Sequence, residues 1–318
     1  MSSTSSRCDA APVPGHADLE AIMTEVGAYR CGIARVEPVD ASSARVYDEW
    51  IAAGRHDTMD YLERYGEVRS DPSLLLEGAR SIIVAAFPYA RPVIPSDGKL
   101  RIASYALGDD YHDVLRRRLE GAAEKIRARW GGATRVCVDT APLRERYWAV
   151  KAGVGFVGIN CQLILPGAGS YFFIGSILST VEMTPDAPCR LSCAGCRRCV
   201  VYCPGQALDG NPSHPTLDAR RCLSCLTIEH RGPLPEGVRL GRRVYGCDTC
   251  QIACPHNRMA DPVEPLPEFA PRPGLLALTR DEVLSMSQEK FSTLFKNSAI
   301  KRAKLAGLQR NAASVEPD

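Results

Sequence analysis

The amino-acid sequence predicts a mixed α/β (α+β) domain, followed by a cysteine-rich module and a short helical tail. Three observations carry this prediction. Apolar runs of strand length alternate with helical patterns between residues 17 and 185, ten cysteines crowd between residues 189 and 254, and a Pro-rich stretch then leads into a helical pattern. We expect residues 1–16 to be a disordered N-terminus, 17–185 the α/β domain, 186–260 the cysteine-rich module and 261–318 the tail.

The elements of the first domain follow from local patterns. Residues 18–26 have amphipathic helical spacing, and residues 81–87 (SIIVAAF) form the continuous apolar run of a strand that is buried on both faces. Residues 111–130 predict a long helix that ends at two glycines. Residues 135–138 predict a strand that delivers Asp139 to its carboxyl end, where α/β sheets usually place ligands.

The next elements are marked by proline and glycine. Pro142 is expected to open a helix at the first position, which proline favours, and Gly153 to end it. Residues 172–180 are a third apolar run, and the sequence TPDAP at 184–188 predicts a linker. In the tail, Thr279 and Glu282 have the spacing of a capping box at the start of a helix.

Eight cysteines have the spacing of ligands to two iron–sulfur clusters. One run reads C-x2-C-x2-C-x3-C-P from Cys193 to Pro204, and the other reads C-x2-C-x3-C-P from Cys247 to Pro255. In two-cluster ferredoxins the fourth cysteine of such a run binds the other cluster. This rule assigns one [4Fe–4S] cluster to Cys193, Cys196, Cys199 and Cys254, and the other to Cys203, Cys247, Cys250 and either Cys222 or Cys225, of which we choose Cys222.

Other uses of these cysteines fit less well. Structural zinc sites need two pairs of ligands, without a third cysteine two residues on or a proline after the last one. A disulfide framework would need an oxidising compartment. Two cysteines are then spare, and we take these to be Cys189 and Cys225, as small buried apolar residues.

Composition narrows the class of protein. An apolar fraction of 45% and a charged fraction of 24% are ordinary for a soluble protein, and a net charge of +2 does not by itself indicate nucleic-acid binding. Residues 1–15 lack the apolar core of a secretory signal, and no stretch approaches the ~18 apolar residues of a membrane span. The many free cysteines predict a reducing cytosol, with no membrane partner.

Longer strings resemble the epoxyqueuosine reductase family, and the match covers nearly the whole chain. The strings are HDTMDYL (56–62), YALGDDYHDVL (105–115), DTAPLRERYWAVKAGVGFVGIN (139–160), LDARRCLSCLTIEHRGPLP (217–235) and RRVYGCDTCQIACPHN (242–257). The cysteine run alone is generic to ferredoxin modules, whereas its combination with the other strings is specific. The resemblance makes residues 17–185 a cobalamin-binding catalytic domain and residues 186–260 a ferredoxin-type domain with two [4Fe–4S] clusters.

The resemblance implies an oxidoreductase of tRNA processing, in queuosine biosynthesis. Family members reduce epoxyqueuosine to queuosine at the wobble position of tRNA. Electrons pass from an external donor of the flavodoxin or ferredoxin type through the clusters to cobalamin. Asp139 matches the proton donor of the family, and burial at a strand end would raise the pKa of its carboxyl group. The alternative structural role for Asp139 is to cap a helix that begins at Ala141 or Pro142.

The resemblance also implies residues that surround the corrin ring. They are Tyr105, Asn160, Ser224, His230, Arg231 and Asp248. His112 and His230 are possible lower ligands of cobalt, but a DxHxxG motif is absent, and we interpret His112 as a polar residue at a helix start. Asn160 has a second reading, in which its only role is to occupy a left-handed turn.

The basic residues of the tail are compatible with tRNA but do not require it. They are Lys296, Lys301, Arg302, Lys304 and Arg310, and the simpler reading is a solvated amphipathic helix that docks through Ile300, Leu305 and Leu308. We expect a monomer. Two other functions stay open: a cobalamin and iron–sulfur reductase of another epoxide or halide, and a ferredoxin-type electron carrier without chemistry of its own.

Overall fold

The computed structural model describes residues 13–315. Most of the predicted N-terminal segment, residues 1–12, lies outside the described residues, and the last residue of that segment, His16, begins the first helix.

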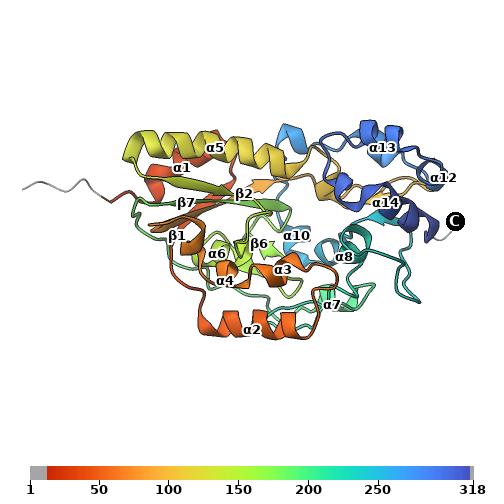
Figure 1. The fold of residues 1–318 in the computed structure, drawn as a ribbon, viewed down its shortest axis with the longest axis horizontal. Coiled ribbons are helices and arrows are strands. Elements are labelled where there is room, and N and C mark those ends of the chain that lie inside the picture. Colours follow the sequence, from red (N-terminus) through yellow and green to blue (C-terminus); the bar gives the residue numbers. More distant parts are fainter. Residues whose placement is uncertain (1–12, 316–318) are drawn as a thin grey trace, which may run out of the picture.

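A four-stranded antiparallel sheet forms the centre of the N-terminal half (Figure 1). Its strands lie in the order β1 (Arg30–Arg35), β2 (Ser81–Pro88), β7 (Phe172–Ser179) and β4 (Thr134–Cys137), and each neighbouring pair is antiparallel. The strands predicted at 81–87, 135–138 and 172–180 are confirmed. The fold is therefore mixed α+β, and β2 is wholly buried because other elements cover both faces of the sheet.

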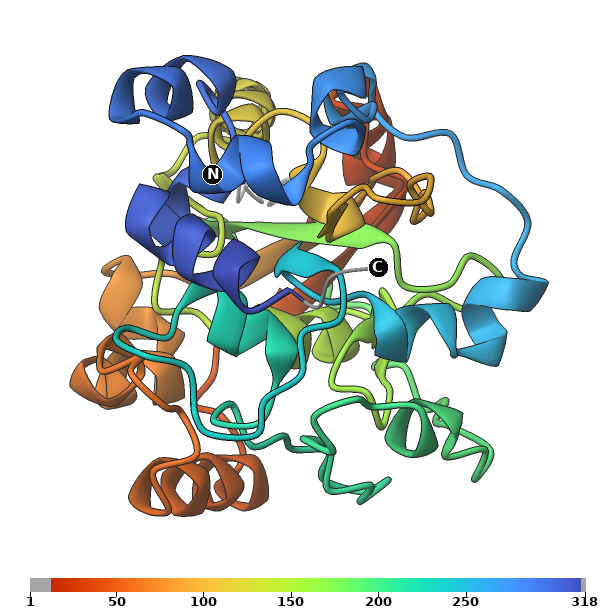
Figure 2. The same cartoon turned by 90° about the vertical axis from the view of Figure 1, so that its right-hand side faces the viewer.

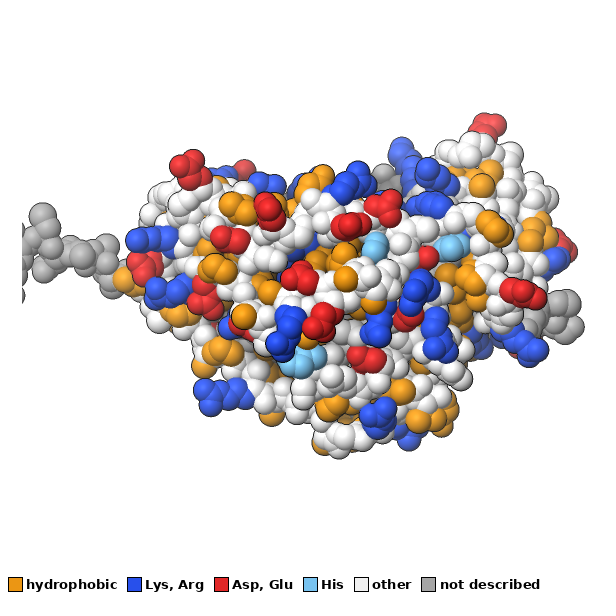
Figure 3. Space-filling view, turned by 60° about the horizontal axis from the view of Figure 1, so that its bottom comes forward, with side chains coloured by type: hydrophobic (Ala, Val, Ile, Leu, Met, Phe, Trp, Pro, Cys, Tyr) orange, Lys and Arg blue, Asp and Glu red, His pale blue; other side chains and the backbone are white. Residues whose placement is uncertain are grey.

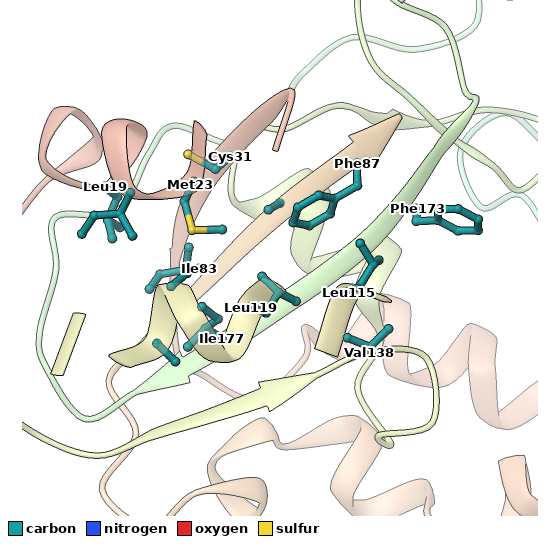
Figure 4. Close-up of a cluster of buried hydrophobic side chains, with 14 of the residues drawn as sticks. Leu19, Met23, Cys31, Ile83, Phe87, Leu115, Leu119, Val138, Phe173 and Ile177 are labelled. Atoms are coloured by element: carbon teal, nitrogen blue, oxygen red, sulfur yellow. The ribbon is translucent and has the colours of Figure 1, made fainter. Parts of the chain in front are cut away.

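Helices α1 (His16–Glu25) and α5 (Tyr111–Trp130) cover one face of the sheet. Leu119 of α5 lies in the same buried cluster as Phe87 and Ile177 of the sheet (Figure 4). The bounds of α5 are those predicted. A carboxylate oxygen of Asp110 accepts the backbone N–H of His112 at its start, and Gly131 ends it with a positive φ of 73°, which glycine adopts without strain.

The opposite face of the sheet carries α6 (Glu145–Lys151), whose Trp148 is fully buried among strand residues. The chain between β1 and β2 forms α2 (Ala41–Ala52), α3 (Tyr61–Arg64), α4 (Gly66–Ser70) and the 3-10 turn η1 (Pro72–Leu75), and α2, α3 and α4 lie on the lower side of the molecule in Figure 1. The prediction that Pro142 opens α6 is wrong, because the helix begins at Glu145. The chain first reverses through tight turns, in which the Leu143 N–H bonds to the Ala141 carbonyl at 2.7 Å.

The cysteine-rich segment contains only short elements. They are α7 (Arg198–Val201), α8 (Leu223–Ile228), β8 (Arg243–Tyr245), α9 (Thr249–Ile252) and α10 (Pro255–Met259). Strand β8 pairs in parallel with β3 (Arg101–Ile102), which precedes the turn η2 (Ser104–Ala106), and the hairpin of β5 (Phe156–Val157) and β6 (Leu163–Ile164) contacts the cysteines. The segment is therefore joined to the first domain by backbone pairing, and the domain boundaries remain a prediction.

The C-terminal segment wraps over the cysteine-rich part. It consists of η3 (Pro267–Phe269), α11 (Pro273–Leu276), α12 (Arg280–Leu284), α13 (Gln288–Leu294), η4 (Ala299–Ala303) and α14 (Lys304–Ala313). The capping box of Thr279 and Glu282 is confirmed at the start of α12. Figure 2 shows the dark blue α14 beside the teal α8, and the two helices are in contact. No helix in residues 13–315 has the length and apolar character to cross a membrane.

Candidate functional site

The eight predicted ligand cysteines form two neighbouring groups. Cys199 lies within electrostatic reach of Cys193, Cys196 and Cys254. Cys250 lies in the same way near Cys247, Cys222 and Cys203, and also near Cys199 of the first group. These are the two sets that the ferredoxin rule predicts, and their role as cluster ligands remains a prediction. The sets come from distant parts of the chain, so only the tertiary fold assembles them.

The surroundings of the sulfur atoms suit thiolates. The backbone N–H of Ile159 donates to Cys193 Sγ at 3.5 Å, and that of Ala207 donates to Cys203 Sγ at 3.3 Å. Cys222 and Cys254 each occupy the residue before a helix, and each accepts bonds from backbone N–H groups of its first turn. Because N–H donors favour the charged sulfur, the chemistry of the site fits iron–sulfur clusters.

Cys222 and Cys225 point to different surroundings. Cys222 lies near Cys247 and Cys203, whereas the buried Cys225 donates from Sγ to Asp57 Oδ2 at 3.7 Å. Burial raises the pKa of both thiols, but backbone N–H groups oppose this rise at Cys222, whereas the charge of Asp57 and the hydrogen bond to it add to the rise at Cys225. The geometry therefore favours Cys222 as the ligand.

The other spare cysteine is Cys189. Cys189 packs beside Phe156 and Ile164, as an apolar residue would. Among residues 13–315, no three His, Cys, Asp or Glu side chains form a group that could hold a single metal ion. The four ligands of a cubane each bind a different iron atom, so they need not converge on one point.

Asp139 follows β4 in a tight turn, with a positive φ of 47°. Its Oδ2 atom accepts bonds from Tyr111 Oη at 2.9 Å and His112 Nε2 at 3.0 Å. Burial raises the pKa of Asp139, but the bonds from His112 and Tyr111 outweigh this effect and hold the pKa below its usual value. The predicted rise is therefore wrong. The capping alternative is also wrong, because the residue before α6 is Arg144 and the Asp139 side chain points to α5.

His112 lies between two carboxylates. Its Nδ1 atom is 2.7 Å from Asp110 Oδ1, and its Nε2 atom is 3.0 Å from Asp139 Oδ2. Burial lowers the pKa of the imidazole, but hydrogen bonds to Asp110 and then Asp139 raise it overall to about 9. The ring is thus positively charged at neutral pH and holds a proton beside Asp139. The sequence interpretation placed His112 correctly at a helix start but missed this contact.

Glu145 is a further residue of this site that sequence reasoning missed. Its Oε1 atom accepts the backbone N–H of Asp139 at 2.9 Å. Burial and the nearby charge of Asp139 raise the pKa of Glu145 to about 8, so it is neutral at pH 7. The sequence offered no signal beyond its position six residues after Asp139, because charged residues are common in turns before helices.

Two of the predicted cobalamin residues connect to the Asp139 site. The Tyr105 ring packs edge-on against Tyr111, with centroids 6.0 Å apart. Asp248 Oδ2 accepts the backbone N–H of Ser104 at 2.8 Å, and burial raises the pKa of Asp248. Asp248 therefore binds the backbone of the residue that precedes Tyr105, so both predicted residues lie at the η2 turn.

Asn160 carries an unpaired donor. The side chain is buried, and its Nδ2 atom has no hydrogen-bond partner among the described residues. Its φ is not in the left-handed region, which Cys161 occupies instead with a φ of 60°, so the turn reading is wrong. A buried amide without a partner fits a ligand with many carbonyl and amide groups, such as a corrin.

The remaining predicted residues use their polar groups inside the protein. His230 Nδ1 lies 2.8 Å from Asp57 Oδ2, and His230 Nε2 lies 2.9 Å from the Pro233 carbonyl. Arg231 donates to the carbonyls of Ile228 and Arg302. Both ring nitrogens of His112 and of His230 are engaged, so neither ring has a free nitrogen for cobalt. Ser224 donates its backbone N–H towards the sulfur of Cys222.

The tail arginines are also engaged within the protein. Arg302 donates three hydrogen bonds to the Glu229 carboxylate, two of them to Oε2 at 2.6 and 2.9 Å, and Arg310 donates to the carbonyls of Leu226, His230 and Gly232. Ile300 and Leu308 are buried, as the docking interpretation predicted. Lys296, Lys301 and Lys304 are exposed.

A separate cavity of about 400 Å³ lies between α1, β1 and the linker. Among the residues that line it are His16, Tyr29, Cys31 and Asp186, and it contains none of the predicted site residues. Because Asp139 and the cysteine groups lie elsewhere, we do not assign the catalytic site to this cavity.

Comparisons with known proteins identify two matching families. Residues 69–140 match the family described as epoxyqueuosine reductase QueG, DUF1730, and residues 192–257 match a 4Fe-4S double cluster binding domain. The chain is 35% identical to the epoxyqueuosine reductase of Xanthomonas campestris pv. campestris, over 98% of this chain and 89% of that protein. It is 37% identical to the enzyme of Gloeobacter violaceus, over 95% of this chain and 96% of that protein.

Solved structures give the same result. An epoxyqueuosine reductase crystallised with an epoxyqueuosine-modified tRNA-Tyr stem loop superposes with a TM-score of 0.84 at 30% identity, covering 93% of this chain and 79% of that one. The enzyme of Bacillus subtilis, in a form whose aspartate-bearing catalytic loop is swung out of the active site, superposes with a TM-score of 0.82 at 29% identity, over the same shares.

Proposed function

The chain belongs to the epoxyqueuosine reductase family, and on this premise we propose that it reduces epoxyqueuosine to queuosine at the wobble position of tRNA, with Asp139 as the proton donor. One observation supports the assignment most directly: a carboxylate held by a charged histidine and a tyrosine stands on the same chain as two sets of four cysteines. Proton supply and electron supply are the two requirements of this reductive chemistry.

The electrons are carried by two [4Fe–4S] clusters. One is held by Cys193, Cys196, Cys199 and Cys254, and the other by Cys203, Cys222, Cys247 and Cys250. Cys196 is exposed, whereas Cys247 adjoins Asp248 of the catalytic side. The electrons therefore enter at the first set and leave from the second.

Cobalamin, when bound, supplies the two-electron attack on the epoxide. The residues that would surround it are Tyr105, Asn160, Ser224, His230, Arg231 and Asp248. The unpaired Asn160 amide and the aromatic wall at Tyr105 support this placement. His230 contributes by fixing its surrounding loop to Asp57, since both of its ring nitrogens are engaged.

The overall reaction takes up two electrons and two protons, removes the epoxide oxygen as water and leaves an alkene. His112 Nε2 gives a proton to Asp139 Oδ2, 3.0 Å away, and Asp139 passes it on to the oxygen of the opening epoxide. Solvent then reloads the imidazole, which supplies the second proton by the same route. The low pKa of Asp139 makes this relay necessary, because the carboxylate itself is ionised at neutral pH. Neutral Glu145 avoids a second negative charge beside Asp139.

The partners are the modified tRNA and an external one-electron donor of the flavodoxin or ferredoxin type. Lys296, Lys301 and Lys304 are exposed and can contact phosphates, whereas Arg302 and Arg310 donate hydrogen bonds within the protein. We propose that the protein acts as a monomer in the cytosol, where its thiols stay reduced and tRNA is present.

The test is anaerobic purification with iron and sulfide analysis, a cobalamin titration followed by absorbance, and turnover of an epoxyqueuosine stem loop followed by mass spectrometry. We expect about eight irons per chain, stoichiometric cobalamin and the loss of one oxygen atom from the nucleoside. Iron without cobalamin binding would leave an electron carrier. Cobalamin binding without turnover would indicate a reductase of another epoxide or halide.

A further inference from the structure

Exposed apolar side chains surround the first cysteine set. Val201 of α7 is 78% exposed and Met259 of α10 is 76% exposed, and Leu191, Tyr202 and Ile252 are also largely exposed. Large apolar side chains gathered on a surface mark a protein interface more often than scattered single ones do. These five residues therefore indicate a surface that binds another macromolecule.

Val201 lies on α7 and Tyr202 directly follows it, Ile252 lies on α9 and Met259 on α10, and Leu191 lies between Cys189 and Cys193. Helix α7 packs against α9, and α9 packs against α10. Cys199 of α7 also lies near Cys254, which precedes α10, and near the exposed Cys196. We call this region the Cys196 surface. It comprises the apolar residues Leu191, Val201, Tyr202, Ile252 and Met259 and the arginines Arg190, Arg197, Arg198 and Arg258.

The charge of the Cys196 surface has one sign. Residues 187–208 and 249–260 contain no Asp or Glu, and they contain four arginines, Arg190, Arg197, Arg198 and Arg258, all exposed. The Arg198 guanidinium stands 5.5 Å from the centroid of the Tyr202 ring, so basic and apolar groups are interleaved. Figure 3 shows the face of the molecule that lies at the bottom of Figure 1, on which basic, acidic and apolar side chains are interspersed.

The acidic residues that flank these segments are engaged elsewhere. Asp186 accepts the backbone N–H of Ile33, Asp209 accepts the Thr216 hydroxyl at 2.6 Å, and Asp248 accepts the backbone N–H of Ser104. The arginines are thus not neutralised by those carboxylates. A basic rim around an apolar centre is complementary to a partner with an acidic rim around an apolar centre.

We propose that the Cys196 surface docks an acidic one-electron carrier protein, and that electrons enter the enzyme there. The inference rests on the proposed function, in which the first cysteine set holds a cluster. Each encounter oxidises the carrier by one electron and reduces the enzyme by one, so two encounters supply one turnover. The aliphatic side chains at its centre favour a protein over RNA, which would need polar and stacking groups.

The test compares two matched double variants. Arg198→Glu with Val201→Ser alters the Cys196 surface. The control Arg117→Glu with Leu74→Ser makes the same charge reversal and a comparable aliphatic-to-serine change at exposed positions on α5 and η1. The probe is a reduced bacterial flavodoxin. Stopped-flow absorbance follows bleaching of the iron–sulfur bands, and turnover is driven separately by a reduced viologen, a small donor that needs no docking surface.

We expect the surface variant to slow bleaching by flavodoxin about tenfold or more at low salt, with the gap closing at high salt. Its iron content and its viologen-driven turnover stay at the wild-type level, and the control variant behaves as wild type. Equal bleaching rates in the two variants would overturn the proposal. So would a surface variant that bleaches normally but loses affinity for the stem loop, since the occupant would then be RNA. Failure of viologen-driven turnover in the wild type would instead refute the proposed function.

Discussion

His112 Nε2 lies 3.0 Å from Asp139 Oδ2, and the other nitrogen of the same ring lies 2.7 Å from Asp110 Oδ1. The imidazole is therefore clamped between two carboxylates, one at the start of α5 and one after β4. The clamp has two consequences of opposite sign: it lowers the pKa of Asp139 and raises that of His112 to about 9. At neutral pH the proton resides on the histidine.

Replacing Asp139 with Asn tests its role as the acid. We expect turnover to fall by at least about 100-fold, because an amide cannot give a proton to the leaving oxygen. Asn accepts the same two hydrogen bonds and tolerates the left-handed φ of 47°. Iron content and cobalamin binding should match the wild type. Turnover at the wild-type rate would remove Asp139 from the mechanism.

Replacing His112 with Gln separates the storage of a proton from the hydrogen bond itself. The Gln amide can still donate to Asp139 but carries no exchangeable positive charge. We expect wild-type kcat to decline as the pH rises through about 9, where His112 loses its proton. The variant should be slower at every pH and lack that decline. An unaltered pH profile in the variant would assign the wild-type decline to another group.

The same residue predicts a pH dependence of stability. The pKa of His112 rises on folding from 6.5 to about 9, so its two ion pairs stabilise the fold fully below about pH 6.5 and cease to do so as the pH passes about 9. The shift corresponds to at most about 3 kcal/mol. Melting temperatures of the wild type and His112→Gln, measured anaerobically, should differ most at pH 6 and converge near pH 10. A constant difference would contradict this.

Replacing Glu145 with Gln should show the opposite trend. Its pKa rises on folding from 4.5 to about 8, so the half-buried carboxyl group destabilises the fold increasingly as the pH rises between these values. Gln has the shape of the neutral acid and carries no such cost. The variant should gain stability relative to the wild type by up to about 1 kcal/mol per pH unit across this range. The gain should shrink in an Asp139→Asn background, because the charge of Asp139 contributes to the shift.

The choice of ligand at α8 can be tested with two serine variants. Cys222→Ser should lower the iron content from about eight to about four per chain, since Cys222 stands with Cys247 and Cys203. Cys225→Ser should keep all the iron, because serine can donate to Asp57 as the thiol does. Iron loss in Cys225→Ser alone would reverse the assignment.

Gly205 lets two segments of the second cysteine set approach each other closely, the segment after Cys203 and the segment before Cys222. A Cβ atom on Gly205 would overlap the carbonyl oxygen of Arg221, the residue before Cys222. We expect Gly205→Ala to separate Cys203 from Cys222 and to lower the iron content to about four per chain. Gly274→Ala is the matched control, because a Cβ there meets no atom within 4 Å. Full iron content in Gly205→Ala would contradict this prediction and show that the backbone at Arg221 can shift to make room for the methyl group.

The sequence by itself determined the features that depend on spacing along the chain. The bounds of α5 follow from a local cap and a terminal glycine pair, the apolar runs correspond to β2 and β7, and the two cysteine runs carry their register in the count between residues. The family likewise follows from strings of consecutive residues. All of these features depend on residues that are close together in the sequence, so they can be predicted without knowledge of the fold.

The tertiary structure decided everything that depends on distance through space. The sequence led us to predict a raised pKa for Asp139, because the residue follows a strand. Hydrogen bonds from Tyr111 and His112, which are 28 and 27 residues away in the chain, lower this pKa instead. The antiparallel order of the strands and the different surroundings of Cys222 and Cys225 also depend on contacts between remote segments. Electrostatic and packing energies depend on which groups are in contact after folding, and the spacing of residues along the chain does not specify those contacts.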